Sequence, residues 1–173
     1  MGPSILVVSL GRIIADQVRF EPDEACAVLV RLSEHVAPIG AGDGAIASVP
    51  SLDAVGITPF GDVEVRRSSG ETVAPANRPE DVARAMAVLL GRLLASGRDT
   101  ITALPTQIVA ACRAASSRRQ DAARIVGSPS GLLDALGAFR PADPSDALAM
   151  VYARWLRTTD GGAIRAVPDR SGA

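Results

Sequence analysis

One segment of the chain would be apolar around nearly its whole circumference if it were helical. Pro79-Glu80-Asp81 opens it, with acidic groups where they suit the positive end of a helix dipole, and Gly97 supplies a stop. One apolar stripe of this segment consists of Val82, Met86, Leu89 and Leu93. The other apolar positions are Ala83, Ala85, Ala87, Val88, Leu90 and Leu94. Because a helix that is apolar all round is normally buried, we expect this one at the centre of the fold.

The composition limits both the core and the chemistry. A chain of 173 residues fits one domain, and with 3% aromatics its core must be built from Ala, Val, Leu and Ile. All 18 basic residues are arginines, and His35 is the only histidine. A Walker-type phosphate loop and a Schiff base each need a lysine, and a catalytic zinc site usually needs two or three histidines. The sequence therefore excludes these three mechanisms.

Charge is divided unevenly along the chain. Residues 1–82 contain six arginines against twelve carboxylates, and residues 83–173 contain twelve against seven. Such a division fits either two surfaces for different partners or attraction between the two halves within the fold.

Further helices and one β-hairpin are expected. Ser9 is a helix cap, Pro22 opens a second helix, and residues 55–58 and 63–66 flank a four-residue turn. The later helices are expected from Pro105, from Ser128 to Leu136, and within residues 141–157, as an additional C-terminal helix, with a disordered tail over 158–173. The fold class is therefore mainly α with one small β-hairpin.

The two cysteines and the apolar runs bear on where the protein resides. Cys26 and Cys112 each lie in a helical apolar pattern, so we expect small buried side chains rather than a disulfide. No run approaches the ~18–20 apolar residues of a membrane span, and Ser4–Leu10 lacks a preceding basic region. A cytoplasmic protein without a membrane segment is expected.

The order of these elements resembles the C-terminal lobe of protein kinases. Residues 52–58 and 60–65 are similar to the kinase hairpin, and Ala74-Pro75 is similar to the start of the Ala-Pro-Glu motif. The helix from Asp81-Val82 to Leu94 is similar to the hydrophobic central helix of that lobe, and the stretch from Pro105 to Leu136 is similar to its closing segment. The resemblance implies a kinase C-lobe-like helical domain.

The N-terminal residues resemble one branch of this class. Val8–Ile14 and Val18–Ala25 are similar to the opening of KIND domains, the kinase non-catalytic C-lobe family. The resemblance covers residues 5–140 and implies a KIND-like domain over 1–140 that serves as a protein-interaction or regulatory module. The composition, with arginine in place of lysine, indicates a bacterial source.

Several positions depart from a working kinase. There is no lysine, no space for an N-lobe before residue 20, and Ala45–Ser51 stands in the place of the catalytic loop. Arg66-Arg67 stands where Asp-Phe-Gly would follow, and Ala76 replaces the glutamate of Ala-Pro-Glu. Without a base, metal ligands or a phosphate lysine, phosphoryl transfer has no electrostatic stabilisation. We therefore predict a non-enzymatic domain with no catalytic residues, no cofactor and no metal.

Two groups of residues are candidates for binding a protein partner. Glu21, Asp23 and Glu24 lie at a helix start, and the KIND resemblance implies recognition of short, often basic, peptide segments there. The alternative is a helix-dipole contribution and ordinary solubility. Tyr152 and Trp155 lie three residues apart on the last helix, where they either pack back on the domain, which is favoured, or contact another protein.

Two other functions stay open as alternatives. The arginines between Arg113 and Arg124 could contact DNA phosphates in a small regulator, although Asp121 interrupts them and no aromatic residue lies nearby, so that a solvated loop is favoured. A nucleotide-binding pseudokinase remnant is the other alternative. The oligomeric state is not indicated by the sequence.

Overall fold

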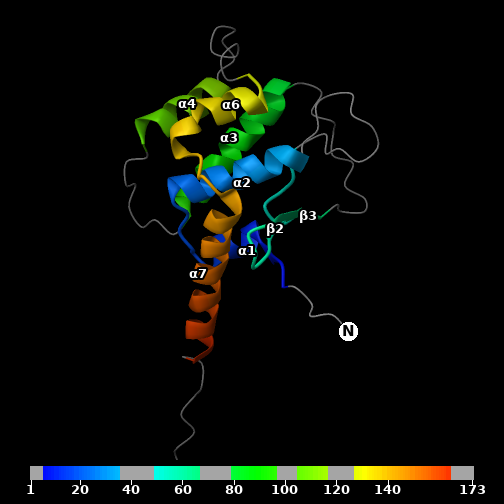
Figure 1. Ribbon diagram of the computed structural model, residues 1–173, viewed down its shortest axis with the longest axis vertical. Helices are drawn as coiled ribbons and strands as arrows, with labels where there is room; N and C mark the ends of the chain where they lie inside the picture. The colour runs from blue at the N-terminus through cyan, green and yellow to red at the C-terminus, as the bar shows by residue number, and fades with distance from the viewer. Residues whose placement is uncertain (1–5, 36–48, 67–78, 97–104, 117–126, 165–173) are drawn as a thin grey trace, which may run out of the picture.

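Helices dominate the described part of the chain, as the sequence predicted (Figure 1). The structure is a computed structural model, and it describes residues 6–35, 49–66, 79–96, 105–116 and 127–164. The elements in chain order are β1 (Val8–Ser9), α1 (Leu10–Ala15), α2 (Pro22–His35), β2 (Val55–Ile57), β3 (Val63–Val65), α3 (Pro79–Ala95), α4 (Thr106–Ser116), α6 (Pro129–Ala135), the 3-10 helix η1 (Gly137–Phe139) and α7 (Pro144–Ile164).

The predicted helix starts are confirmed where a local cap defines them. The side-chain oxygen of Ser9 accepts a hydrogen bond from the Arg12 amide at 3.2 Å and so caps α1. Pro22 is the first residue of α2, where its missing N–H costs nothing. Ser128 caps α6 by accepting from the Gly131 amide at 3.1 Å.

The hairpin is confirmed, but the sheet has a third strand that the sequence did not predict. β2 pairs with β3 with Val55 opposite Val65, and β1 pairs antiparallel with the other edge of β2. β1 has only two residues, too few to show the alternation by which a strand is recognised. A Cβ at Gly56 would lie 2.4 Å from a Val7 side-chain carbon, so glycine permits this close approach.

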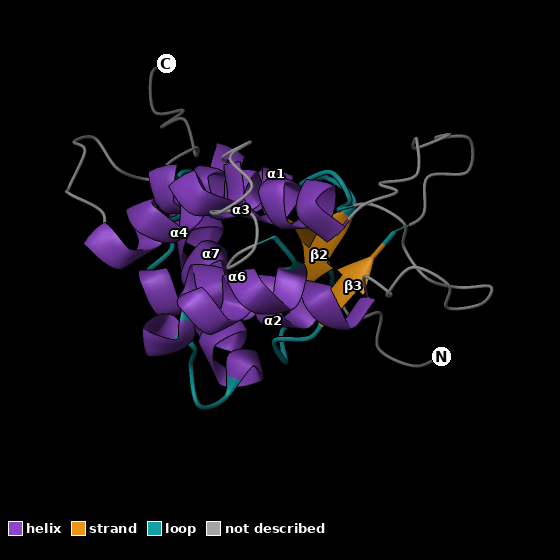
Figure 2. Cartoon of the chain, turned by 90° about the horizontal axis from the view of Figure 1, so that it is seen from above, coloured by secondary structure: helices purple, strands orange, loops and turns teal. Residues whose placement is uncertain are grey.

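Helix α3 lies among α2, α4 and α6, as expected for a central helix (Figures 1 and 2). Its buried side chains are Val82, Ala83, Met86, Ala87, Leu89, Leu90, Leu93 and Leu94. One face of this central helix is nevertheless uncovered, since the side chain of Val88 is 50% exposed. The apolar pattern predicted burial without indicating which face a neighbour leaves uncovered.

The C-terminal helix is longer than predicted. α7 begins at Pro144, where Asp143 accepts from the Ser145 amide at 2.8 Å, and it continues to Ile164. In Figure 1 it runs away from the group formed by α3, α4 and α6. The expected tail from residue 158 is therefore helical over its first seven residues, whereas residues 165–173 lie outside the described part.

Several sequence features cannot be compared with the structure. Ala74-Pro75, Ala76 and three of the four arginines proposed to bind DNA (Arg118, Arg119 and Arg124) lie outside the described residues. Within the described ranges, no helix is both long enough and apolar enough to cross a membrane.

Candidate functional site

The acidic start of α2 is engaged with α7. Glu24 is 6% exposed, and its carboxylate accepts from the Arg154 guanidinium at 2.5 and 3.1 Å. The same carboxylate accepts from the Glu21 amide at 2.9 Å, so it also caps its own helix. The hydrogen bond from Arg154 to Glu24 raises the pKa of that guanidinium above its ordinary value. Glu24 is thus part of the junction between two helices.

The remaining acidic residues of this helix start are at the surface. Glu21 pairs with Arg19 at 3.0 Å in a half-exposed ion pair, and Asp23 is exposed. Exposed pairs of this kind contribute little to stability because solvent screens them. Only these two of the three acidic candidates can meet a partner.

Tyr152 and Trp155 pack back on the domain, which was the favoured alternative. They are 6% and 8% exposed, and their rings lie 5.6 Å apart between centroids. The Tyr152 hydroxyl donates to the Leu6 carbonyl at 3.0 Å, and the Trp155 indole N–H donates to the Asp16 carboxylate at 2.9 Å. Both polar atoms are therefore satisfied within the chain.

These contacts change the predicted binding surface. Of the five candidates, Glu24, Tyr152 and Trp155 are buried at the junction of α7 with α1 and α2, so they do not present a free surface. The interpretation of the uneven charge as attraction within the fold is supported here, because Glu24 from the acidic half pairs with Arg154 from the basic half. No local pattern in the sequence indicates this pairing, since Glu24 and Arg154 lie on different helices, 130 residues apart.

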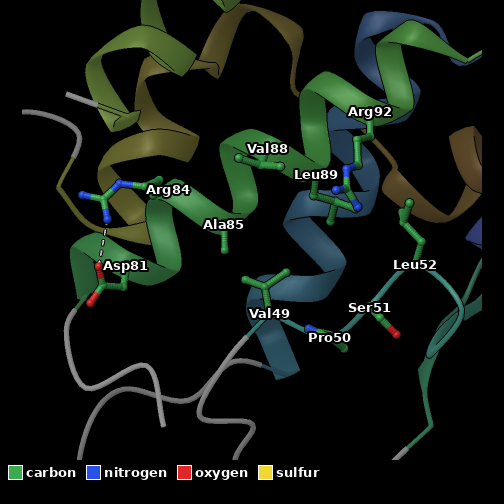
Figure 3. Close-up of a pocket in the computed structure, with 10 residues that line it drawn as sticks. All are labelled: Val49, Pro50, Ser51, Leu52, Asp81, Arg84, Ala85, Val88, Leu89 and Arg92. Atoms are coloured by element: carbon green, nitrogen blue, oxygen red, sulfur yellow. Dashed lines mark hydrogen bonds and ion pairs between the residues drawn. The ribbon is translucent and has the colours of Figure 1, made fainter. Parts of the chain in front are cut away.

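An open concavity lies elsewhere, along the uncovered face of α3. A groove of about 490 Å³ runs between α3 and the segment 49–52, which precedes β2 (Figure 3). Its lining residues are Val49, Pro50, Ser51, Leu52, Asp81, Arg84, Ala85, Val88, Leu89 and Arg92. It therefore combines an apolar floor with charged side chains from one helix.

The two walls of this groove are fixed by different contacts. The Leu52 carbonyl accepts from the Gly11 amide at 3.0 Å, and the Ser51 carbonyl accepts from the Ala54 amide at 3.0 Å. These bonds tie segment 49–52 to α1 and to the turn before β2. On the other wall, Ser96 at the end of α3 donates from its hydroxyl to the Val18 carbonyl at 2.8 Å. Both walls are thereby held to the N-terminal part of the domain.

The two arginines that line the groove differ in their ion pairing. Arg84 pairs with Asp81 at 2.9 Å, and both side chains are substantially exposed. In Figure 3 Arg92 extends from α3 toward the side of segment 49–52. Among the residues that the structure describes, Arg92 makes no ion pair. The lining set has two arginines against one aspartate, so it favours an anionic group.

A smaller groove lies between α3 and α4. It has a volume of about 290 Å³ and is lined by Ala87, Gly91, Leu94, Ile108, Val109, Cys112 and Arg113. A Cβ at Gly91 would meet nothing within 4 Å, so this floor is open. Arg113, the DNA-binding candidate that the structure describes, is placed beside this apolar groove.

Both cysteines are free thiols, as the sequence predicted. Burial raises the pKa of Cys26 to about 12, with smaller contributions from Asp23 and Cys112. Burial also raises the pKa of Cys112, which is partly exposed in the α3–α4 groove. Neither thiol has the lowered pKa of a nucleophilic cysteine.

The described residues contain no group of three or more His, Cys, Asp or Glu side chains placed to hold a metal ion. The groove along α3 offers apolar contact and guanidinium groups. It can hold a segment of another molecule through burial and charge, and it presents no nucleophile paired with a base.

No model of a known protein family matches the chain, and no curated protein matches it. The resemblance to kinase C-lobes and KIND domains stays a prediction from the sequence.

Proposed function

We propose that this chain is a non-catalytic domain that binds a segment of another protein in the groove between α3 and residues 49–52. The observation that carries the proposal is the half-exposed Val88, which lines the groove, with Arg84 and Arg92 about one helical turn to either side of it on α3. An apolar side chain flanked by guanidinium groups is typical of a site that buries an apolar anchor and orients it by charge.

The non-catalytic part of the proposal rests on the sequence. The lysine, the catalytic-loop aspartate and the metal ligands that phosphoryl transfer needs are missing from the positions that resemble a kinase. The KIND resemblance adds support, because it implies binding of peptide segments by a domain without activity. A cytoplasmic location is part of the same proposal and agrees with two free thiols.

The proposal moves the docking surface away from the start of α2. Glu24 is buried in an ion pair with Arg154, and Tyr152 and Trp155 of α7 are covered by other parts of the chain. The groove along α3, by contrast, has an apolar side chain that gains burial when a partner arrives. Covering a half-exposed valine contributes up to about 1 kcal/mol, so several such contacts are needed for stable binding.

A peptide selection tests this function directly. The intact chain is used as bait for a random peptide library displayed on phage, and enriched peptides are synthesised and their affinities measured by fluorescence anisotropy. Val88→Asp places a charge in the groove, and Met150→Asp does so at an exposed position of α7 that does not line the groove. Circular dichroism and urea unfolding establish that both variants are folded.

The expected result is that enriched peptides bind the wild-type chain and Met150→Asp equally but bind Val88→Asp at least tenfold more weakly. If no peptide is enriched over an unrelated bait, or if Val88→Asp binds as well as Met150→Asp, the proposed function is wrong.

A further inference from the structure

We infer that the partner segment is an acidic amphipathic helix whose carboxylates flank an apolar side chain. This inference rests on the proposed function and adds the chemistry of the partner. It follows from the spacing, the charges and the hydrogen bonding of the groove between α3 and segment 49–52.

The spacing comes from α3. Arg84, Val88 and Arg92 are four residues apart, so they form one ridge along the exposed face of the helix. With a rise of 1.5 Å per residue, the two arginines are separated by about 12 Å along the axis, with the valine midway. A second helix lying along this ridge meets the same repeat when its carboxylates are seven or eight residues apart.

The charges select carboxylates rather than ammonium or guanidinium groups. Arg92 has no ion-pair partner among the described residues. A carboxylate of the partner can therefore pair with Arg92 without displacing a carboxylate of the described residues. Arg84 shares its charge with Asp81, and the two side chains are 39% and 48% exposed. Such an exposed pair is worth less than about 1 kcal/mol, so a partner's carboxylate can replace Asp81 at little cost.

The opposite wall does not suit an added β-strand. Pro50 has no amide hydrogen, and the carbonyls of Ser51 and Leu52 already accept bonds from Ala54 and Gly11. A peptide strand laid against this segment would find few free backbone groups. Side chains, not backbone groups, therefore make the recognition, and a helix presents them at the spacing that α3 requires.

Reciprocal charge reversal, on the protein and on the peptide, tests the inference. The peptides enriched against the wild-type chain are expected to contain two acidic residues seven or eight apart, with Leu, Ile, Val or Met between them. Arg92→Glu is expected to weaken their binding at least tenfold. Peptides in which the matching Glu is changed to Arg are expected to regain affinity for Arg92→Glu and to bind the wild-type chain weakly.

Arg157→Glu is the matched control, since Arg157 is an exposed arginine of α7 that does not line the groove and makes no ion pair with a described residue. Arg157→Glu changes the net charge by the same amount as Arg92→Glu, and its affinity for the acidic peptides should lie within twofold of that of the wild-type chain. Raising the salt concentration should lower the affinity of the acidic peptides more for the wild-type chain than for Arg92→Glu.

The outcomes separate this inference from the proposed function. If the enriched peptides are neutral or basic, or if Arg92→Glu and Arg157→Glu bind them equally well, the inference of an acidic partner helix is wrong. If those peptides still lose affinity for Val88→Asp, the interaction function holds. If Val88→Asp has no effect, the groove itself is not the docking surface.

Discussion

The ion pair between Glu24 and Arg154 should contribute measurably to the attachment of α7, and a double-mutant cycle measures it. Arg154→Met keeps the aliphatic packing but removes both donors to a carboxylate that is 8% exposed. Breaking a buried pair from one side costs about 3–5 kcal/mol. We expect the lower end, about 3 kcal/mol, because the Glu21 amide still donates to Glu24 and Arg154 is itself 32% exposed.

The other single variant should cost less. Glu24→Gln keeps the shape, and its carbonyl oxygen can still accept one hydrogen bond, so the expected loss is about 1 kcal/mol. The double variant Glu24→Gln/Arg154→Met has no buried charge, and its expected loss is about 2 kcal/mol. Glu24→Gln therefore destabilises the wild-type chain but should stabilise Arg154→Met by about 1 kcal/mol.

Urea unfolding followed by the fluorescence of Trp155 provides the assay. Trp155 is the single tryptophan and lies in the same junction, where its indole donates to Asp16. The exposed pair of Asp81 and Arg84 is the control, and its cycle should give a coupling below about 0.5 kcal/mol. If the effects at Glu24 and Arg154 simply add, or if the double variant is the least stable, the buried pair does not hold α7.

Three further predictions concern single positions. Gly61→Ala should lower the free energy of unfolding by about 2 kcal/mol or more, because φ is 78° and a Cβ would lie 1.8 Å from the Ser145 carbonyl oxygen. Gly137→Ala, where a Cβ would meet open space, should not lower it, and equal urea midpoints for the two variants would contradict the packing of this turn on α7. Iodoacetamide, followed by mass spectrometry, should modify the partly exposed Cys112 before Cys26 in the native chain, and the reverse order would contradict their burial. Since the pKa of Cys26 is raised from 9.0 to about 12, the unfolded chain loses this proton first above pH 9, so Cys26 should lower stability by up to about 1.4 kcal/mol per pH unit. The slope should be smaller in Cys26→Ala, where only Cys112 of the two raised thiols remains, and identical slopes in the two chains would show that Cys26 does not contribute.

The parts of the fold predicted from the sequence are those with local causes. The cap at Ser9, the start of α2 at Pro22 and the turn between β2 and β3 depend on residues within about five positions of one another. Their signals are backbone geometry and nearby hydrogen bonds, which neighbouring residue types determine.

The parts that were missed have distant causes. β1 is a strand because β2 offers it an edge, and the role of Arg154 depends on a carboxylate on another helix. The same limit explains the candidate site. The apolar pattern around Val88 predicts burial, and the open face of α3 becomes visible only when the neighbouring helices are in place. The acidity of a helix start and the spacing of two aromatic residues predicted five partner residues, and the packing of α7 against α1 and α2 covers three of them.

The junction of α2 with α7 also sets an order of events during synthesis. Glu24 and Arg154 are 130 residues apart in sequence, so at about 5–20 residues per second the ribosome adds the arginine roughly 7–26 s after the glutamate. Until then α2 cannot bury its first turn without leaving a carboxylate uncompensated. The first turn of α2 can therefore reach its native packing only after α7 has been synthesised.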